Sequence, residues 1–536
     1  STPKPSSAAS DVYKRQNTNR DYEAANESDH KLLMNAYEFL LKNIYELKEY
    51  IPKDKIPRQN KVFAPLLNIG LRYWYEIFNP RQLLALAALT KYVRERSKEL
   101  VLKDGEFGAA VSLYLCFGLS KMIDFNTILT TWNVTNKSIR DTIGQYARSR
   151  KVELNIEYCE AVVPYKNLPW VFEPYTLNRT GGGICPVVEE LCKQMAGNKT
   201  NAKIFQFDAK KIHLLNKNID LINVDPPYFD QHIYSDLSEF FWMLIRVSLK
   251  NLIGNYLFNE EINGKKSWEY IDWNPYSPFV PRKDELIVRK ESYAEEIEKY
   301  KRNMTEFFRN AYKVLKDDGK LVLWFTHKSW KAWETILYSI YISGFKVKGF
   351  YPFVSEHPTR SVSMQGEPKL NRTIVIIASK KANEIKNIED DVFYFCSKVY
   401  EHLNYAKIMP REKIEMWEKA ITLMAASTAR LTTLNFENKE LAFENEILPK
   451  GITLGLTSLL KILGKEREME NLDAQDMSNL LLHVLQKLYG RVRIDLAKRI
   501  CKFYNIPLSL TQNGRVKLKN PNRDLLSILE VLEVKK

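Results

Sequence analysis

The sequence Leu-Ile-Asn-Val-Asp-Pro-Pro-Tyr, residues 221–228, decides the fold that we predict for this chain. Its apolar start predicts a short buried strand, which must stop after Asp225 because prolines cannot donate to a sheet ladder. In an open α/β sheet, reacting groups lie just beyond the carboxyl ends of the strands. We therefore expect Asp225, Pro226, Pro227 and Tyr228 to lie at the functional edge of such a sheet.

The residue types at this strand end suit methylation of an exocyclic amino group on a nucleobase. Such an amine is a weak nucleophile, because its lone pair is delocalised into the ring. Two acceptors aimed at its N–H bonds, the Asp225 carboxylate and the Pro226 carbonyl, can draw the nitrogen toward a tetrahedral shape. Tyr228 can stack on a base that has swung out of the duplex. The structural alternative is an ordinary strand end followed by a Pro-Pro turn.

The segments that follow fit the second half of a doubly wound α/β sheet. Their patterns predict helices over residues 292–315 and 330–342, and strands over residues 321–326, 345–353 and 372–379. Upstream, Lys203 to Asp208 predicts a further strand that ends in an acid. Asp208 is then either a cofactor contact or a helix N-cap.

Periodicity and composition divide the chain into a mainly helical region (17–165), a core with the sheet (166–380) and a helical C-terminal region (381–536). We predict N-terminal helices over residues 32–50, 81–102, 107–129 and 136–150, and another over residues 186–195. The basic helix 136–150 either exposes its charged face to solvent or contacts phosphates. The aromatic and basic segment 251–290 grips a nucleic-acid strand or packs as a flap. We predict C-terminal helices near 389–404, 410–430, 452–463, 473–488 and 492–503. These helices recognise DNA, bind a partner or brace the sheet.

Composition favours a cytoplasmic protein with a polyanionic partner. The 536 residues are 45% hydrophobic, enough for two to four domains, and carry a net charge of +15. The sequence contains no run of 18 or more apolar residues, so it predicts no membrane span. The six cysteines form no Cys-x-x-Cys pair, so we expect reduced thiols and no metal site. Cys185 and Cys192 have the spacing of core residues on a helix.

Residues 1–16 resemble the in-frame translation of a sequencing-library adapter. We exclude them from the fold prediction, and expect the natural sequence to begin at Asn17 or later and the chain to be a fragment. A second unusual segment is Gly181-Gly182-Gly183. A cofactor-binding glycine loop is the less favoured interpretation there, because too little chain separates it from Asp225 for the strands that a nucleoside-binding half needs.

From about Lys61 to Lys380, the chain resembles the large prokaryotic adenine-specific DNA methylases that carry a zinc-ribbon insertion. The resemblance depends on several motifs in register: Phe78–Leu86 (FNPRQLLAL), Asp124–Asn126, Asp208–Ala209, Asp225–Tyr228, Tyr234–Phe241 and His327–Ser329. It implies a Rossmann-like class I methyltransferase sheet with helical insertions and an all-α C-terminal region.

The same resemblance implies a site and a reaction. S-adenosylmethionine would be the cofactor, near Asp208 and Ala209, and residues 225–228 would be the catalytic motif. Tyr234, Asp236 and Lys328 would contact the substrate, double-stranded DNA methylated at N6 of adenine. Partner proteins of a restriction or defence system would follow from this function.

The chain departs from the family pattern upstream of Phe78. In that family a glycine-rich cofactor loop, the acid that holds the ribose, and the zinc ribbon precede the Pro-Arg-Gln-Leu-Leu segment. None is visible between Asn17 and Phe78. We therefore expect the N-terminal half of the sheet to be missing, the parent protein to methylate DNA, and this chain alone to bind S-adenosylmethionine weakly or not at all.

Other functions use the same residues. N4-cytosine methylation and amino methylation of RNA remain open, and so does a catalytically inactive DNA-binding subunit. C5-cytosine methylation is disfavoured, because its cysteine nucleophile usually follows a proline and the chain has no Pro-Cys pair.

Overall fold

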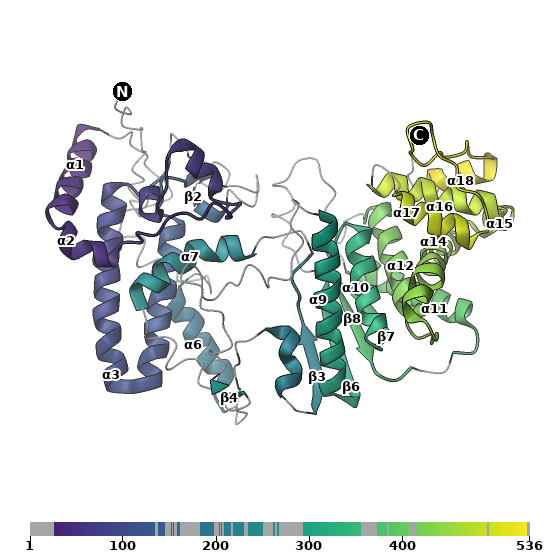
Figure 1. The fold of residues 1–536 in the computed structure, drawn as a ribbon, viewed down its shortest axis with the longest axis horizontal. Helices are drawn as coiled ribbons and strands as arrows, with labels where there is room; N and C mark the ends of the chain where they lie inside the picture. The colour runs from purple at the N-terminus through teal and green to yellow at the C-terminus, as the bar shows by residue number, and fades with distance from the viewer. Residues whose placement is uncertain are drawn as a thin grey trace. The chain divides into compact units, whose positions relative to one another are not determined.

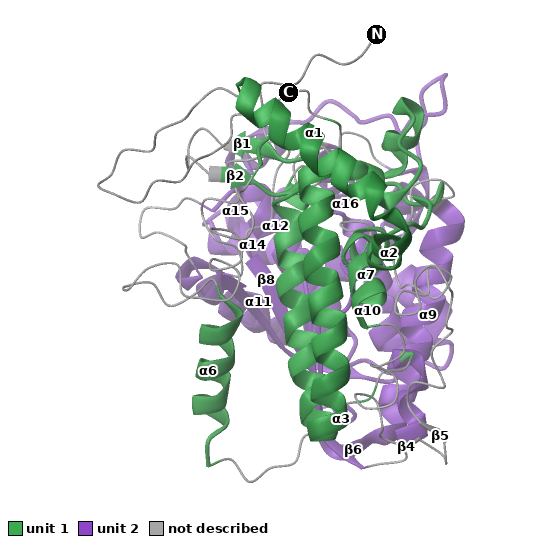
Figure 2. Cartoon of the chain, turned by 90° about the vertical axis from the view of Figure 1, so that its left-hand side faces the viewer, with its two compact units in different colours: residues 1–208, 233–285 green, residues 209–232, 286–536 purple. Residues whose placement is uncertain are grey.

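A computed structural model gives the fold of the chain (Figure 1). It describes residues 26–133, 138–144, 152, 154, 158–160, 183–197, 203, 205, 208–215, 218–229, 234–249, 261–262, 265–266, 293–354, 372–382, 385–406, 414–489 and 493–532. The chain forms two compact units, residues 1–208 with 233–285 and residues 209–232 with 286–536 (Figure 2). Each unit is described by itself below.

The first unit is organised around α3 (Pro80–Asp124). Asn79 caps this helix: its side chain accepts a 2.9 Å hydrogen bond from the Gln82 amide, and the Gln82 side chain accepts one of 2.9 Å from the Asn79 amide. Gly105, at φ 52°, breaks α3 into two arms. The two helices predicted over 81–102 and 107–129 are thus confirmed, although the second ends earlier, at Asp124.

One window of 18 residues in α3 is apolar enough to cross a membrane by length and composition. Half of that window is buried inside the protein, and Gly105 interrupts the helix. An apolar helix with this degree of burial behaves as a core element of its unit.

Aromatic rings join the segment around Phe63 to η3 (Trp74–Ile77) and α7 (Tyr234–Leu249) of the first unit. Phe63 stacks on Phe240 with 5.3 Å between ring centroids and meets Trp74 edge to face at 5.0 Å. The elements of this unit, besides α3, are α1 (Glu27–Lys42), α2 (Ile44–Leu47), η1 (Lys48–Tyr50), η2 (Ala64–Ile69), η3 (Trp74–Ile77), α6 (Ile184–Met195), α7 (Tyr234–Leu249), and the strand pairs β1 (Thr131–Asn133) with β2 (Ser138–Arg140) and β4 (Glu261–Ile262) with β5 (Lys265–Lys266).

Two expectations for the first unit are wrong. Residues 138–140, predicted as helix, form β2 and pair antiparallel with β1; residues 142–144 are helical as predicted, and residues 145–150 lie outside the described residues. The helix predicted at 186–195 is present as α6, but it buries none of its residues, and Cys185 and Cys192 are both exposed. The seven-residue spacing of these two cysteines therefore does not place them in a core.

The second unit contains a four-stranded sheet with the order β3-β6-β8-β7. Its strands are β3 (Ile219–Val224), β6 (Leu315–Phe325), β7 (Lys346–Val354) and β8 (Arg372–Ser379). β3 and β6 are parallel, and the other neighbours are antiparallel. This confirms the predicted strand before Asp225 and the closing strand pair. The expected burial of the first strand is wrong: within β3 only Ile222 is buried and Leu221 is 55% exposed, because β3 is an edge strand of the four-stranded sheet. Of the predicted strand 203–208, residues 203, 205 and 208 are described, and they lie in no strand.

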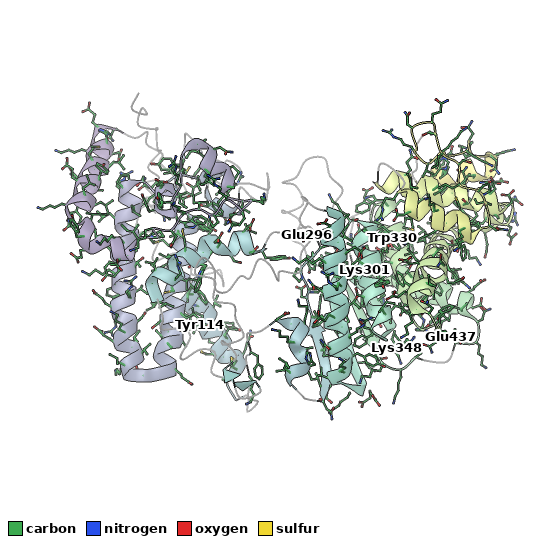
Figure 3. The ribbon with its side chains drawn as sticks, in the orientation of Figure 1. Tyr114, Glu296, Lys301, Trp330, Lys348 and Glu437 are labelled. Carbon is green, nitrogen blue, oxygen red and sulfur yellow. The ribbon has the colours of Figure 1, made fainter. Side chains whose placement is uncertain are left out.

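Two helices cover one face of this sheet, α9 (Tyr293–Val314) and α10 (Trp330–Ile342), both as predicted. Leu321, Leu323 and Phe325 point to them and are fully buried. Phe325 meets Trp333 of α10 edge to face at 5.0 Å. The ammonium of Lys301, labelled in Figure 3, lies 3.8 Å from the Tyr338 ring centroid and joins α9 to α10.

The outer edge of β7 is closed by α12 (Met416–Leu431). The Val347 amide donates to Thr432 Oγ1 at 3.1 Å, and Lys346 Nζ donates to the carbonyl oxygens of Thr432 at 3.0 Å and Leu434 at 3.1 Å. The residues after α12 thus engage the start of this edge strand.

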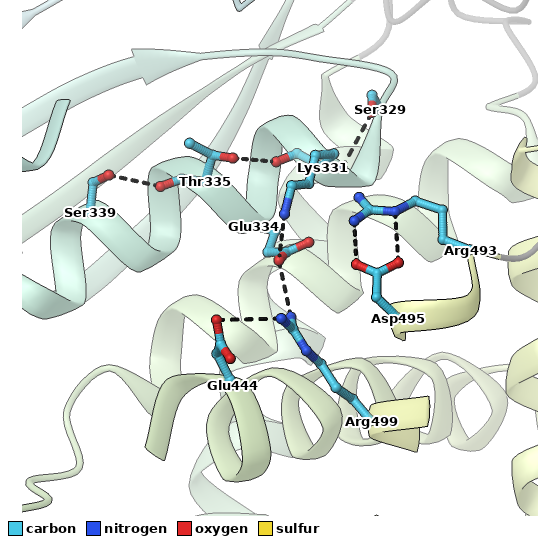
Figure 4. Close-up of polar contacts among 9 residues, drawn as sticks. All are labelled: Ser329, Lys331, Glu334, Thr335, Ser339, Glu444, Arg493, Asp495 and Arg499. Carbon is cyan, nitrogen blue, oxygen red and sulfur yellow. Dashed lines mark hydrogen bonds and ion pairs between the residues drawn. The ribbon is translucent and has the colours of Figure 1, made fainter. Parts of the chain in front are cut away.

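The C-terminal helices share one hydrophobic core with the sheet, so the structure sets no boundary near residue 381. They are α11 (Ile388–Tyr405), α12, α13 (Lys439–Ala442), the π-helical turn η7 (Phe443–Ile447), α14 (Leu448–Ile462), α15 (Glu466–Glu470), α16 (Ala474–Tyr489), α17 (Ile494–Phe503) and α18 (Arg523–Val531). Arg499 of α17 contacts Glu334 of α10 at 3.1 Å and Glu444 of η7 at 3.3 Å (Figure 4). Bracing of the sheet is thus one role of this region.

Candidate active site

The carboxylate of Asp225 is exposed at the carboxyl end of β3. The strand before it is anchored by Ile222, which is buried, and the next residue, Pro226, is buried as well. Within the described residues, the Asp225 carboxylate takes part in no ion pair or hydrogen bond. An acid that is fixed by its neighbours but keeps all its acceptor positions can receive hydrogen bonds from a ligand.

The Pro-Pro turn after Asp225 is held from the core side. Tyr300 of α9 is 1% exposed, and its hydroxyl donates a 3.0 Å hydrogen bond to the Pro227 carbonyl oxygen. That oxygen also accepts a 2.9 Å bond from the Phe229 amide. No donor among the described residues meets the carbonyl oxygen of Pro226. The turn therefore occupies one proline carbonyl and leaves the other available, as two-acceptor chemistry requires.

Phe229 completes this turn in a left-handed conformation, with φ at 50°. This conformation costs free energy for a residue with a side chain, and surrounding contacts must hold it. The Phe229 ring is fully buried and meets Tyr300 at 5.2 Å and His327 at 5.4 Å, both edge to face. These contacts fix the direction in which the chain leaves Asp225.

Tyr228 is half-buried, and its ring meets Phe325 edge to face at 6.3 Å. Part of the ring is thus fixed against the end of β6, while the rest is accessible. This is compatible with the stacking role predicted from the sequence.

The His327-Lys328-Ser329 segment follows β6 and divides into structural and exposed residues. His327 is 1% exposed; its Nδ1 accepts a 2.9 Å bond from the Ser329 amide, and its carbonyl oxygen accepts 2.8 Å from Trp333 Nε1. Ser329 caps α10. Lys328, the predicted substrate contact, is exposed beside them.

Two predicted substrate contacts, Tyr234 and Asp236, belong to the first unit, whereas Asp225 belongs to the second. Tyr234 begins α7 and is 38% exposed. Asp236 is fully buried: its Oδ2 accepts a 2.7 Å bond from the Lys61 amide, and its carbonyl oxygen accepts 3.0 Å from Asn60. The geometry of Asp236 supports an anchor for the 60–63 loop in place of a substrate contact.

The predicted cofactor residues lie where the two units meet along the sequence. Asp208 is half-buried and ends the first unit, and Ala209 is exposed and begins the 3-10 helix η4 (Ala209–Leu215) of the second. Asn310 of α9 donates 2.8 Å to the Lys210 carbonyl oxygen and holds η4 in place. Gly181 and Gly182 lie outside the described residues, and Gly183 precedes α6 with an ordinary extended φ of −98°.

Sequence reasoning missed two residues at this site, Tyr300 and Trp324. Tyr300 lies on a helix more than 70 residues downstream, and no local pattern indicates its bond to Pro227. Trp324 was detectable, because strand alternation places it on the face opposite to Leu323 and Phe325.

Comparison with known proteins assigns no family: no family model, no curated protein and no solved structure matches the chain. The support for a function therefore comes from the geometry at the end of β3 and the residues around it.

Proposed function

We propose that this chain belongs to a methyltransferase that acts on the N6 amino group of adenine in DNA. One observation supports it most: an exposed carboxylate that no described residue engages, at the end of a parallel strand, followed by a Pro-Pro turn whose Pro226 carbonyl meets no donor among the described residues. An amine with two N–H bonds needs two fixed acceptors, and Asp225 with the Pro226 carbonyl offers them on a backbone held by Tyr300.

The role of each group follows from its chemistry. Asp225 accepts one N–H of the base and the Pro226 carbonyl accepts the other, which localises the lone pair on nitrogen. The nitrogen would then attack the activated methyl carbon, the electron pair of the broken bond would stay on the donor sulfur, and the Asp225 carboxylate would accept the proton that the nitrogen releases. Tyr228 supports the extruded base by stacking. A catalytic nucleophile on the protein is not needed.

S-adenosylmethionine is the methyl donor that we propose, and when bound it would supply the activated methyl group. Among the described residues, Asp208 is an acid suited to one end of such a cofactor. The described residues contain no glycine-rich turn after a parallel strand, so they form only part of the grip that this cofactor needs.

The fold is compatible with this proposal. The order β3-β6-β8-β7 places a pair of parallel strands next to an antiparallel pair, with Asp225 at the carboxyl end of a parallel strand. This is the position that binding groups occupy in doubly wound sheets. The helices α9 and α10 cover one face, whereas a complete doubly wound sheet has helices on both faces.

The test is expression of the chain and of Asp225→Ala in a bacterial host that lacks adenine methylation, followed by mass spectrometry of DNA nucleosides. Because this chain alone should bind S-adenosylmethionine weakly, we expect a low but measurable level of N6-methyladenine with the wild-type chain and none with Asp225→Ala, while both proteins bind DNA equally. N4-methylcytosine as the product would move the assignment to that base. Equal methylation by both proteins, or none by either, would contradict the proposal.

A further inference from the structure

The face of the sheet that α9 and α10 do not cover carries an aromatic pair next to the candidate active site. Along β6, buried Leu321, Leu323 and Phe325 alternate with half-buried Val322 and Trp324, which point to the opposite face. Asn223 is in register with Val322, so Asn223 and, two residues later, Asp225 lie on the side of Trp324. Val224 is in register with Leu323, so the next residues along the two strands, Asp225 and Trp324, lie opposite each other.

Specific contacts fix the Trp324 indole in this position. Its Nε1 donates a 2.8 Å hydrogen bond to Asn223 Oδ1, which turns the ring toward β3. On the other side its ring lies 6.1 Å from that of Phe353 on β7, across β8. Phe353 is 51% exposed. Two adjacent rings thus lie accessible beside the exposed acid.

Positive charge lies on the same face, nearer the other end of the strands. Lys320 is in register with Leu221, four residues before Trp324 on β6, or about 13 Å at a rise of about 3.3 Å per residue. Lys348 of β7 is labelled in Figure 3. Burial lowers the pKa of Lys348, and the charges of Lys320 and Arg430 lower it further. Lys320 can thus attract the phosphates of a nucleic-acid strand whose base lies on the rings.

We propose that Trp324, supported by Phe353, is the stacking surface for the nucleobase presented to Asp225. This inference rests on the proposed function and adds a binding residue to it. The Trp324 ring contacts the base from the sheet side, and Tyr228 contacts it from the turn. A nucleic-acid strand is favoured over a protein layer, because the accessible rings lie beside an acid that no described residue engages and on the same face as Lys320. Leu221, 55% exposed, is the residue that a covering protein layer would bury.

The experiment measures binding of a short single-stranded oligonucleotide that carries one 2-aminopurine and a terminal fluorophore. Fluorescence anisotropy gives the affinity, and quenching of 2-aminopurine reports stacking. We expect Trp324→Ala to bind roughly five- to hundred-fold more weakly and to lose the quenching, the effect of one base–aromatic stack. Trp324→Phe should keep affinity within about threefold. The matched control is Tyr394→Ala, which removes an aromatic ring that is 65% exposed on α11.

The outcomes of this experiment test the stacking surface independently of the proposed function. Unchanged affinity and quenching in Trp324→Ala, or no binding by the wild-type chain, overturns it. So does a change confined to the oligomeric state in sedimentation, which would assign the face to a protein partner. Phe353→Ala repeats the test should Trp324→Ala unfold, and circular dichroism identifies that case. If both ring variants weaken binding while no protein methylates DNA, the stacking surface stands and the proposed function fails.

Discussion

Tyr300 of α9 donates a 3.0 Å hydrogen bond to the carbonyl oxygen of Pro227. This bond joins a core helix to the turn that positions Asp225, so the acceptor pair depends on a residue remote in sequence. Tyr300→Phe keeps the buried ring and removes only the hydroxyl. We expect it to cost about 1 kcal/mol of stability and to lower kcat about tenfold or more, because a small displacement of the acceptors misaligns the amine.

The measurements for Tyr300→Phe are kcat, KM and urea unfolding. Tyr312→Phe on the same helix is the control, since the Tyr312 ring packs on Phe345, at 5.2 Å, and away from the Pro-Pro turn. An unchanged kcat in Tyr300→Phe would show that this bond does not position the turn.

A second prediction concerns the first unit, where burial, and then the nearby charge of Asp141, raise the pKa of Asp124 to about 7. Because a carboxyl in the unfolded chain has a pKa near 4, the folded state holds a proton that the unfolded state releases between about pH 4 and pH 7. The stability of the first unit should therefore fall as the pH rises through this window, by up to about 4 kcal/mol.

Asp124→Asn imitates the protonated acid and keeps an acceptor for the Ile143 amide, 3.0 Å from Asp124 Oδ1. We expect calorimetry to show a higher unfolding temperature for this variant than for wild type at pH 8 and little difference at pH 4. Asp104→Asn, an exposed acid on α3, should change neither. A variant that is less stable than wild type at pH 8 would contradict the buried charge.

The third prediction concerns the buried ion pair that joins β8 to α12. Arg372 and Glu418 are 2% and 3% exposed, with Nη1 at 2.9 Å and 3.0 Å from the two carboxylate oxygens. Arg372→Met leaves Glu418 charged and buried, and should cost about 3–5 kcal/mol in urea unfolding. The double variant Arg372→Met with Glu418→Leu should recover much of that loss, because two apolar side chains leave no buried charge without a partner. A double variant as unstable as the single one would show that the pair contributes net stability.

Local patterns predicted much of the second unit. Residues 219–224 form a strand because apolar alternation ends at two prolines, and α10 and α11 begin where Ser329 and Asn387 cap them. These signals act within a few residues of each other, which is why they are visible in one sequence. The fold of the described residues is accordingly mixed α/β, as predicted.

Contacts between distant residues were not predictable in the same way. Asp236 lies in an aromatic, acidic segment typical of a binding site, yet its carboxylate meets the Lys61 amide, 175 residues away. Residues 138–140 form a strand only because residues 131–133 pair with them. The amphipathic pattern of the C-terminal helices does not specify their partner, and the structure shows that they share the core of the sheet.

The central claim is that Asp225 accepts a hydrogen bond from the reacting amine, and a graded series of variants tests it most directly. The measurement is the transfer of labelled methyl groups from S-adenosylmethionine to DNA by wild type, Asp225→Asn and Asp225→Ala at equal DNA occupancy. Asn keeps one acceptor oxygen at the same place, so we predict residual activity for Asp225→Asn and at least about a hundredfold loss for Asp225→Ala. Equal activity of Asp225→Ala and wild type would contradict the account.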